Sequence, residues 1–148
     1  MNNPIALGCD GAGFVLMQAI KAHLREEGLT YKDFGAHSDA PSDYPVYARL
    51  VAEAVLSGEC EKGIIICGTG IGISIMANRF DGIRCALCHD TFSARASRQH
   101  NNSNVLAMGG RVIGRGLACE IADAWLKTGF SGDERHARRI DMMDGLGG

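Results

Sequence analysis

A cysteine and three glycines stand together near the middle of the sequence, in the stretch IIICGTGIGIS at residues 64–74. Cys67 ends a β-branched run that is typical of a buried strand, and Gly68, Gly70 and Gly72 follow it at alternate positions. Where a strand turns into a helix, such glycines can leave backbone N–H groups free to bind an anion, although a tight turn alone also uses glycine. The positive end of that helix would favour the thiolate form of Cys67. We therefore predict a basic thiol beside an anion-binding turn.

Other candidate residues follow predicted strands or lie on predicted helices. Asp10 follows the first strand and could exchange a proton with a substrate hydroxyl, or cap the next helix. His100 ends a predicted helix, where histidine is also a common partner of the helix dipole. Arg135 and Arg139 are spaced i, i+4, so they could clamp a phosphate or belong to a solvated charged face. Arg111, after the fifth strand, could join such a clamp or only cover a strand end.

Short apolar runs alternate along the chain with longer segments of helical period, and these elements must position the candidate residues. The runs predict strands near residues 5–10, 29–35, 62–68, 83–88 and 104–110. The longer segments predict helices near residues 14–28, 44–58, 70–80, 91–101 and 114–130, and a polar helix over residues 132–145 with Asp133 as its N-cap. Strands that are apolar throughout need cover on both faces. We therefore predict a three-layer αβα sandwich with a Rossmann-like, five-stranded parallel sheet and an extra C-terminal helix, whose ligands bind at the carboxyl ends of the strands.

Length and composition limit the classes of protein that the chain can belong to. A chain of 148 residues, 46% of them hydrophobic, predicts one compact domain over residues 1–148. Its formal net charge of -2 argues against nucleic acid or an anionic membrane surface as a partner. No basic leader precedes a long apolar segment, and no apolar run approaches the roughly 20 residues of a membrane span. We expect a soluble cytoplasmic protein.

The sequence contains 6 cysteines among mostly apolar neighbours, which predicts reduced and buried thiols. The inert group is expected to include Cys60, Cys85, Cys88 and Cys119. The string from Cys85 to His89 matches the C-x-x-C-H pattern for covalent haem attachment, and zinc is a further possibility. However, the run reads as a buried strand, on which residues three apart point to opposite faces. We therefore predict that this string packs in the core.

A dinucleotide site is an alternative interpretation of the N-terminal glycines. Gly11 and Gly13 open the first helix, and Asp33 ends the second strand, near the place of a ribose-binding carboxylate. The spacing is not G-x-G-x-x-G, and Asp10 would set a negative charge against the pyrophosphate. The length also leaves little chain for a substrate domain, so we favour a site without a nicotinamide cofactor.

Several segments resemble the RpiB/LacAB family of sugar-phosphate isomerases: GCDGAGF, DYPVYA, IIICGTGIGISIMANRF, GIRCAL, SRQHNNSNVLAMGGRVIG and RHARR. The similarity runs over nearly the whole chain. It implies an aldose-ketose isomerase that uses no cofactor or metal and acts on ribose 5-phosphate, or on a tetrose 4-phosphate or hexose 6-phosphate. A sugar-phosphate or nucleotide-binding module without turnover is the alternative from another class.

The resemblance also implies roles for particular residues. Cys67 would carry a proton between C2 and C1 through a cis-enediolate, and the amides of residues 68–72 would form its oxyanion hole. The other catalytic residues that it implies are Asp10, Thr69 and His100. The substrate contacts that it implies are Gly11, Tyr44, Gly68, Gly70, Ile71, Gly72, Asn101, Arg111, Arg135, His136 and Arg139. The family builds its active sites between two subunits, which implies a homodimer or tetramer in which the arginine helix could serve a partner's site.

One motif departs from the family. Its first motif usually reads Cys-Asp-His, whereas this chain has Cys9-Asp10-Gly11. The loss of an imidazole there is expected to enlarge the pocket and to remove a hydrogen-bond donor. The identity of the sugar therefore stays open among phosphates that differ by a few hydroxyl contacts.

Overall fold

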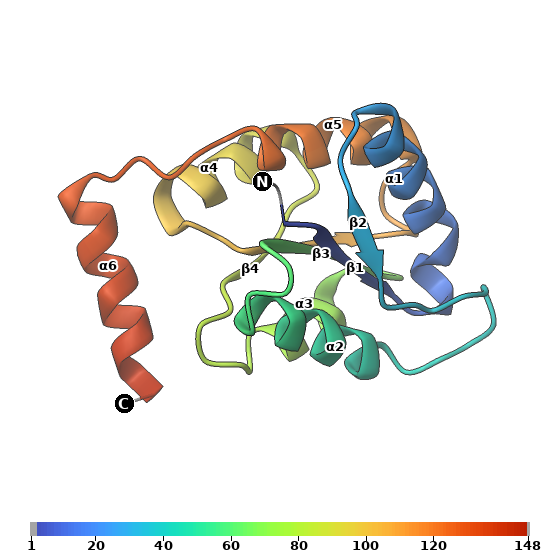
Figure 1. The fold of residues 1–148 in the computed structure, drawn as a ribbon, viewed down its shortest axis with the longest axis horizontal. Coiled ribbons are helices and arrows are strands. Elements are labelled where there is room, and N and C mark those ends of the chain that lie inside the picture. The colour runs from blue at the N-terminus through green and yellow to red at the C-terminus, as the bar shows by residue number, and fades with distance from the viewer. Residues whose placement is uncertain (1–2, 148) are drawn as a thin grey trace.

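A five-stranded parallel sheet in the order β2-β1-β3-β5-β4 runs through the middle of the protein (Figure 1). The computed structural model describes residues 3–147. Its strands are β1 (Ile5–Cys9), β2 (Tyr31–Asp33), β3 (Lys62–Cys67), β4 (Cys85–Leu87) and β5 (Val105–Gly109). The register pairs Ile66 with Cys9 and Cys67 with Gly109, so the three central strands end close together. The predicted convergence of strand ends at one edge is confirmed.

Helices cover both faces of the sheet and complete the predicted three-layer sandwich (Figure 1). The helices α1 (Phe14–Glu26), α4 (Thr91–Asn101) and α5 (Arg115–Leu126) lie on one face, and α2 (Tyr44–Leu56) and α3 (Ile71–Ala77) lie on the other. The strand residues alternate between the two cores, since Ile64 and Ile66 pack with α1 and α5 while Ile65 packs with α2 and α3. Apolar side chains on both faces thus explain the uninterrupted hydrophobic run in β3.

The edge strand β4 and the helix α3 are shorter than the sequence predicts, because side-chain amides turn the chain between them. The Asn78 amide binds both the N–H and the C=O of Cys85, which ends α3 and starts β4. The Ile83 N–H donates to the Phe80 carbonyl within the turn. The Arg84 N–H donates to the side chain of Asn104. These donors are therefore not available for a longer strand.

The Cys85 to His89 string lies only partly in the core, since Cys88 is buried whereas Cys85 is half-buried and Leu87 is exposed. Cys85 contacts the core on the α2 and α3 side, whereas Cys88 belongs to the opposite core. Burial raises the pKa of the Cys88 thiol to about 11 and also raises the pKa of Cys85. The Nε2 atom of His89 accepts a hydrogen bond from the Gly109 N–H at 3.0 Å. The three side chains therefore do not converge on one haem or zinc ion.

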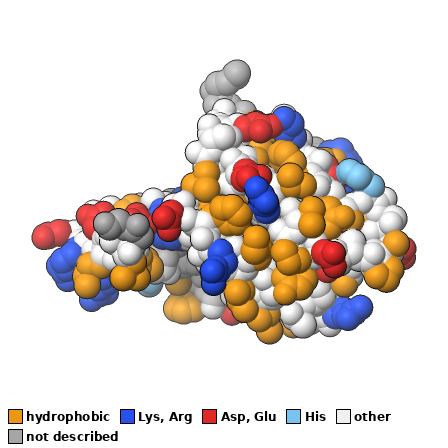
Figure 2. All heavy atoms as spheres, turned by 90° about the horizontal axis from the view of Figure 1, so that it is seen from below, with side chains coloured by type: hydrophobic (Ala, Val, Ile, Leu, Met, Phe, Trp, Pro, Cys, Tyr) orange, Lys and Arg blue, Asp and Glu red, His pale blue; other side chains and the backbone are white. Residues whose placement is uncertain are grey.

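The C-terminal helix α6 (Glu134–Asp144) lies to one side of the three layers in both Figure 1 and Figure 2. Asp133 precedes it as predicted, but its side chain makes no capping hydrogen bond. His136 and Ile140 are the buried residues of α6, and Asp144 forms an ion pair with Arg84. Among residues 3–147, no helix has both the length and the apolar character to cross a membrane.

Candidate active site

An open cleft of about 580 Å³ lies at the carboxyl ends of the central strands. Its walls come from the ends of β1 and β3, the turn into α3, the segment before α2, and Arg111 in the turn after β5. They comprise Asp10, Ala12, Asp39, Pro41, Ser42, Tyr44, Cys67, Gly68, Thr69, Ile71, Gly72 and Arg111. The structure thus brings a large part of the predicted site together in one chain.

Cys67 is the last residue of β3, and its thiol sits at the base of a tight turn. The side chain is almost fully buried, and Sγ accepts a hydrogen bond from the Gly70 N–H at 3.2 Å. Gly70 has a φ of 78°, which brings its amide back toward the strand end. An N–H donor directed at sulfur stabilises negative charge on it. The geometry suits a thiol that must accept a proton.

The fold constrains the three alternate glycines to different degrees. Gly70 needs its positive φ, and a Cβ there would also lie 2.6 Å from the Leu87 side chain. A Cβ on Gly72 would lie 2.6 Å from the ring of Tyr44. A Cβ on Gly68 would meet nothing closer than 3.5 Å, where the Arg111 guanidinium lies. The fold therefore does not require glycine at residue 68, whereas a ligand that approaches the backbone there would.

Some amides of the turn are already occupied. The Gly70 N–H binds Sγ of Cys67, and the Ile71 N–H donates to Oγ1 of Thr69 at 3.1 Å. The amides of Gly68, Thr69 and Gly72 donate to no atom of residues 3–147. The turn therefore offers fewer free amides than the five that the sequence led us to expect at residues 68–72. Its free donors are these three N–H groups on the cleft wall.

Asp10 combines the two roles that the sequence left open. Its Oδ1 accepts a hydrogen bond from the Gly13 N–H at 3.0 Å and so caps the short 3₁₀ helix Gly11–Gly13. The carboxylate is buried and also lines the cleft beside Cys67. Its Oδ2 forms no hydrogen bond with the described part of the chain. One oxygen therefore holds the side chain in place, and the other is available to a ligand.

Arg111 lies on the wall of the same cleft. Its backbone N–H donates to the Gly68 carbonyl at 2.9 Å, which ties the residue after β5 to the turn after β3. Its guanidinium forms no ion pair within residues 3–147 and is exposed. An unpaired guanidinium beside free amides is suited to a phosphate.

The remaining predicted residues form a second cluster on α4 and α6. The His100 and His136 rings lie 4.6 Å apart, and Ser131 Oγ is 2.7 Å from Nδ1 of His136. Burial, together with the charges of His100 and Arg135, lowers the pKa of His136. Exposed residues of the cluster are His100, Asn101, Arg135 and Arg139. Asn101 borders another cavity of about 490 Å³, between β4 and the end of α6.

The fold separates this second cluster from the cleft of the same chain. The N-cap of α4 is Asp90, which follows β4 at the carboxyl edge of the sheet, and α4 then runs back along the sheet. Its 11 residues span about 16 Å, and His100 and Asn101 stand at the far end. The cleft and the cluster therefore do not form one site within a single chain.

The space beside Gly11 differs from the expectation of an enlarged pocket. A Cβ on Gly11 would lie 2.0 Å from the Ala40 carbonyl oxygen, so backbone fills the place where a side chain would stand. The same segment adds Asp39, Pro41 and Ser42 to the cleft, and the sequence analysis did not identify these residues. They belong to a ten-residue connection without hydrophobic period between β2 and α2, so only the presence of serine and aspartate could have drawn attention to them.

The dinucleotide interpretation loses its ribose-binding candidate. Asp33 accepts a hydrogen bond from the Gly35 N–H at 2.9 Å and forms an ion pair with the buried Lys21 of α1. Both interactions hold β2 against α1 and engage the carboxylate that a ribose would need. The interpretation is therefore not supported.

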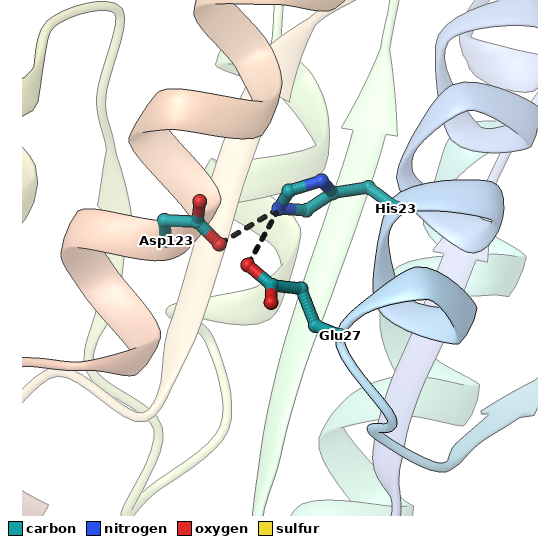
Figure 3. A group of neighbouring side chains, drawn as sticks. All are labelled: His23, Glu27 and Asp123. Atoms are coloured by element: carbon teal, nitrogen blue, oxygen red, sulfur yellow. Dashed lines mark hydrogen bonds and ion pairs between the residues drawn. The ribbon is translucent and has the colours of Figure 1, made fainter.

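One group of described side chains has the spacing of metal ligands, but it lies away from the cleft. Figure 3 shows His23 of α1 pointing to Asp123 of α5, with Glu27 beside them. The His23 Nε2 atom is 2.7 Å from Asp123, and the Lys127 ammonium is 3.4 Å from Glu27. Lys127 thus supplies a positive charge to the carboxylates. We interpret the group as an ion-pair network that joins the ends of two helices.

Comparisons with known proteins agree with one another. The sequence model described as Ribose/Galactose Isomerase matches residues 5–143. Ribose-5-phosphate isomerase B of Escherichia coli is 51% identical over 96% of this chain and 95% of its own length. D-erythrulose-4-phosphate isomerase of Pectobacterium atrosepticum is 45% identical over 86% of this chain and 85% of its own length. The structure of ribose-5-phosphate isomerase B from Clostridium thermocellum superposes with a TM-score of 0.95 at 47% identity and covers 97% of both chains.

The two glycines that flank Thr69 should respond differently to alanine. Gly70→Ala should lower the free energy of unfolding by about 2 to 4 kcal/mol, because it strains a left-handed residue and collides with Leu87. Gly68→Ala should change it by less than about 0.5 kcal/mol, since its Cβ would make only ordinary van der Waals contacts with Arg111 and Ala12. Urea denaturation of both variants measures the difference. Equal losses would show that the turn needs both glycines for folding.

Proposed function

Because the chain belongs to the Ribose/Galactose Isomerase family, we propose that it is a cofactor-independent aldose-ketose isomerase whose substrate pair is ribose 5-phosphate and ribulose 5-phosphate. The observation that carries the proposal is the cleft in which a buried thiol, a carboxylate oxygen, free amides and an unpaired guanidinium meet. Each of these groups has a task in moving a proton between two adjacent carbons of a phosphorylated sugar.

The thiolate of Cys67 acts as the base. It takes the proton from C2 of the open-chain aldose, which leaves a cis-enediolate, and the resulting thiol returns the proton to C1 to give the ketose. The proton on the C2 hydroxyl meanwhile passes to the oxygen on C1, and Oδ2 of Asp10 is available for that transfer. The sum is an isomerisation in which no electron acceptor or hydride carrier takes part.

Free backbone amides stabilise the enediolate. The N–H groups of Gly68, Thr69 and Gly72 have no partner within residues 3–147 and can bind developing charge on O1 and O2. A preorganised donor of this kind typically contributes about 3 to 4 kcal/mol to lowering the barrier. The Gly70 amide already binds Sγ, so it serves the base.

A second copy of the chain completes the site in this proposal. His100 would assist ring opening, Asn101 would bind the sugar, and Arg135 and Arg139 with His136 would hold the phosphate together with Arg111 of the cleft. The residues that the second copy supplies stand at the far end of α4 and on α6, which projects from the layered body, so they can reach the cleft of another subunit. A symmetric dimer would then hold two equal sites, each built from both chains.

An exposed apolar face supports association with a second copy. Val46 and Leu50 follow each other at i, i+4 on α2, and Ile71 and Ile75 do so on α3. Figure 2 views the molecule from the side of these helices and shows hydrophobic side chains gathered there. Ile71 also borders the cleft, so a subunit that covers this face would lie next to Cys67.

The size of the sugar has a second candidate. The relative from Pectobacterium is named for a four-carbon substrate at 45% identity, close to the 51% of the pentose enzyme from Escherichia coli. Backbone also fills the space beside Gly11. Erythrose 4-phosphate therefore has to be compared with ribose 5-phosphate directly.

Proton exchange tests the activity and the base together. In deuterium oxide the wild-type protein should move solvent deuterium into C1 of the ketose, and Cys67→Ala should lower turnover about a thousandfold or more. Inorganic phosphate should still inhibit or bind the variant, because the amides and Arg111 remain. Nuclear magnetic resonance on ribose, erythrose, allose and galactose phosphates measures exchange and ranks kcat/KM.

Cys119→Ala on α5 is the matched control and should keep full activity, since its partly buried thiol lies away from the cleft. Full turnover in Cys67→Ala would remove the proposed base. Binding of every phosphosugar without any exchange would identify a binding module instead of an isomerase.

Hybrid dimers test the shared site. A purified heterodimer of Cys67→Ala with the double variant Arg135→Ala/Arg139→Ala has one intact site if each site uses both chains, so it should show about half of the wild-type kcat/KM. A heterodimer of wild type with Cys67→Ala should give the same value in either arrangement and serves as the control. No recovery in the first hybrid would place both halves within one subunit.

A further inference from the structure

The segment Asp39–Ser42 forms one wall of the cleft, and a backbone N–H binds it there. The N–H of Gly11, the first residue of the short 3₁₀ helix after β1, donates to Oγ of Ser42 at 3.0 Å. Asp39, Pro41 and Ser42 all face the same space as Cys67 and Arg111. A loop that connects β2 to α2 is therefore fixed to the edge of the sheet at the point where substrate would bind.

Glycine at residue 11 is what allows this approach. A Cβ there would lie 2.0 Å from the Ala40 carbonyl oxygen and 2.8 Å from the Asp39 carbonyl oxygen. Both atoms belong to the backbone, so no side-chain rotation could relieve the contact. Any larger residue at position 11 must push the segment outward and lengthen the hydrogen bond to Ser42.

The hydroxyl of Ser42 is left with a proton to donate. Its oxygen already accepts from Gly11, and its O–H finds no acceptor among residues 3–147. The Tyr44 hydroxyl and the Arg111 guanidinium border the same cleft and likewise have no acceptor in the described chain. Three donors without acceptors around one cleft suit a ligand group that is rich in acceptor oxygens, such as a phosphate.

We propose that Ser42 is a substrate-binding residue that donates to the phosphate of the sugar, and that Gly11 is the positioning residue that places it. The inference rests on the proposed isomerase function and deepens it, since it names the phosphate contact that this chain makes with its own loop. Gly11 and Ser42 act as a pair, in which the backbone N–H of residue 11 holds the loop hydroxyl beside the cleft.

Removal of the hydroxyl tests the contact. Ser42→Ala should raise KM for ribose 5-phosphate about tenfold, the size expected for one hydrogen bond to a charged group, with kcat within about twofold of wild type. The inhibition constant of inorganic phosphate should rise by the same factor, because Ser42 is proposed to contact the phosphate group and not the sugar carbons or hydroxyls.

Ser38→Ala is the matched control, since Ser38 binds the Ala40 N–H within the same loop but does not border the cleft. It should leave both constants unchanged. Unchanged constants in Ser42→Ala, or an equal rise in Ser38→Ala, would overturn the assignment of Ser42.

A double-mutant cycle tests the positioning. Gly11→Ala should raise KM and the phosphate inhibition constant at least as much as Ser42→Ala does, and the double variant should be no worse than Gly11→Ala alone. Multiplied effects would mean that the two residues act independently and would refute the pairing. If Gly11→Ala does not fold, the comparison of Ser42→Ala with Ser38→Ala still decides the phosphate contact.

The two proposals fail in different ways. If the wild-type protein isomerises no phosphosugar, the proposed function fails, and phosphate binding to Ser42→Ala by calorimetry still reports on the contact. If the wild-type protein isomerises and Ser42→Ala matches it in both constants, the inference alone fails.

Discussion

The hydrogen bond from the Gly70 N–H to Sγ of Cys67 is the constraint around which the cleft is built. Burial raises the pKa of Cys9 and of Cys88 to about 11, and neither of these thiols borders the cleft. Cys67 is buried as well, and its sulfur accepts a hydrogen bond from a backbone amide at the cleft. The turn that supplies this amide needs a left-handed residue three positions after the strand, and the same turn leaves neighbouring amides free for a ligand.

Sheet topology explains why half of the proposed machinery lies elsewhere. In a parallel α/β fold each helix starts at the carboxyl edge and ends at the opposite edge, so residues at the end of α4 cannot reach the cleft after β3 in the same chain. The chain nevertheless presents His100 beside α6, where two arginines are exposed. In the proposed dimer, a second copy would bring these arginines to the cleft, where they would meet the phosphate from the side opposite to Ser42 and Arg111 of the subunit that carries Cys67.

Sequence patterns predicted those parts that depend on local chemistry. The apolar runs identified the strands and the order of elements, and the position of Cys67 before spaced glycines identified the turn. The predicted lengths of α3 and of the edge strand β4 were less accurate, because the Asn78 side chain ends α3 through a contact with Cys85 that no local pattern encodes. Asp10 was undecided between cap and ligand contact, and its two oxygens allow both. The number of free amides could not be read from the sequence, because it depends on two contacts. The Gly70 N–H donates to Sγ of Cys67, and the Ile71 N–H donates to the Thr69 hydroxyl.

The position of the loop before α2 could not be predicted from the sequence, and the reason is physical. Its residues have no periodic pattern, and their place is set by what they touch, namely the backbone of Gly11 and the cleft. A motif comparison at residue 11 counts only the loss of a side chain and so predicts more room. The fold fills that room with a carbonyl from Ala40, because the absence of a Cβ is what admits the main chain. Replacing a side chain by glycine can therefore reshape a binding site by drawing in a neighbouring segment, and the donor it removes can return from that segment as the Ser42 hydroxyl.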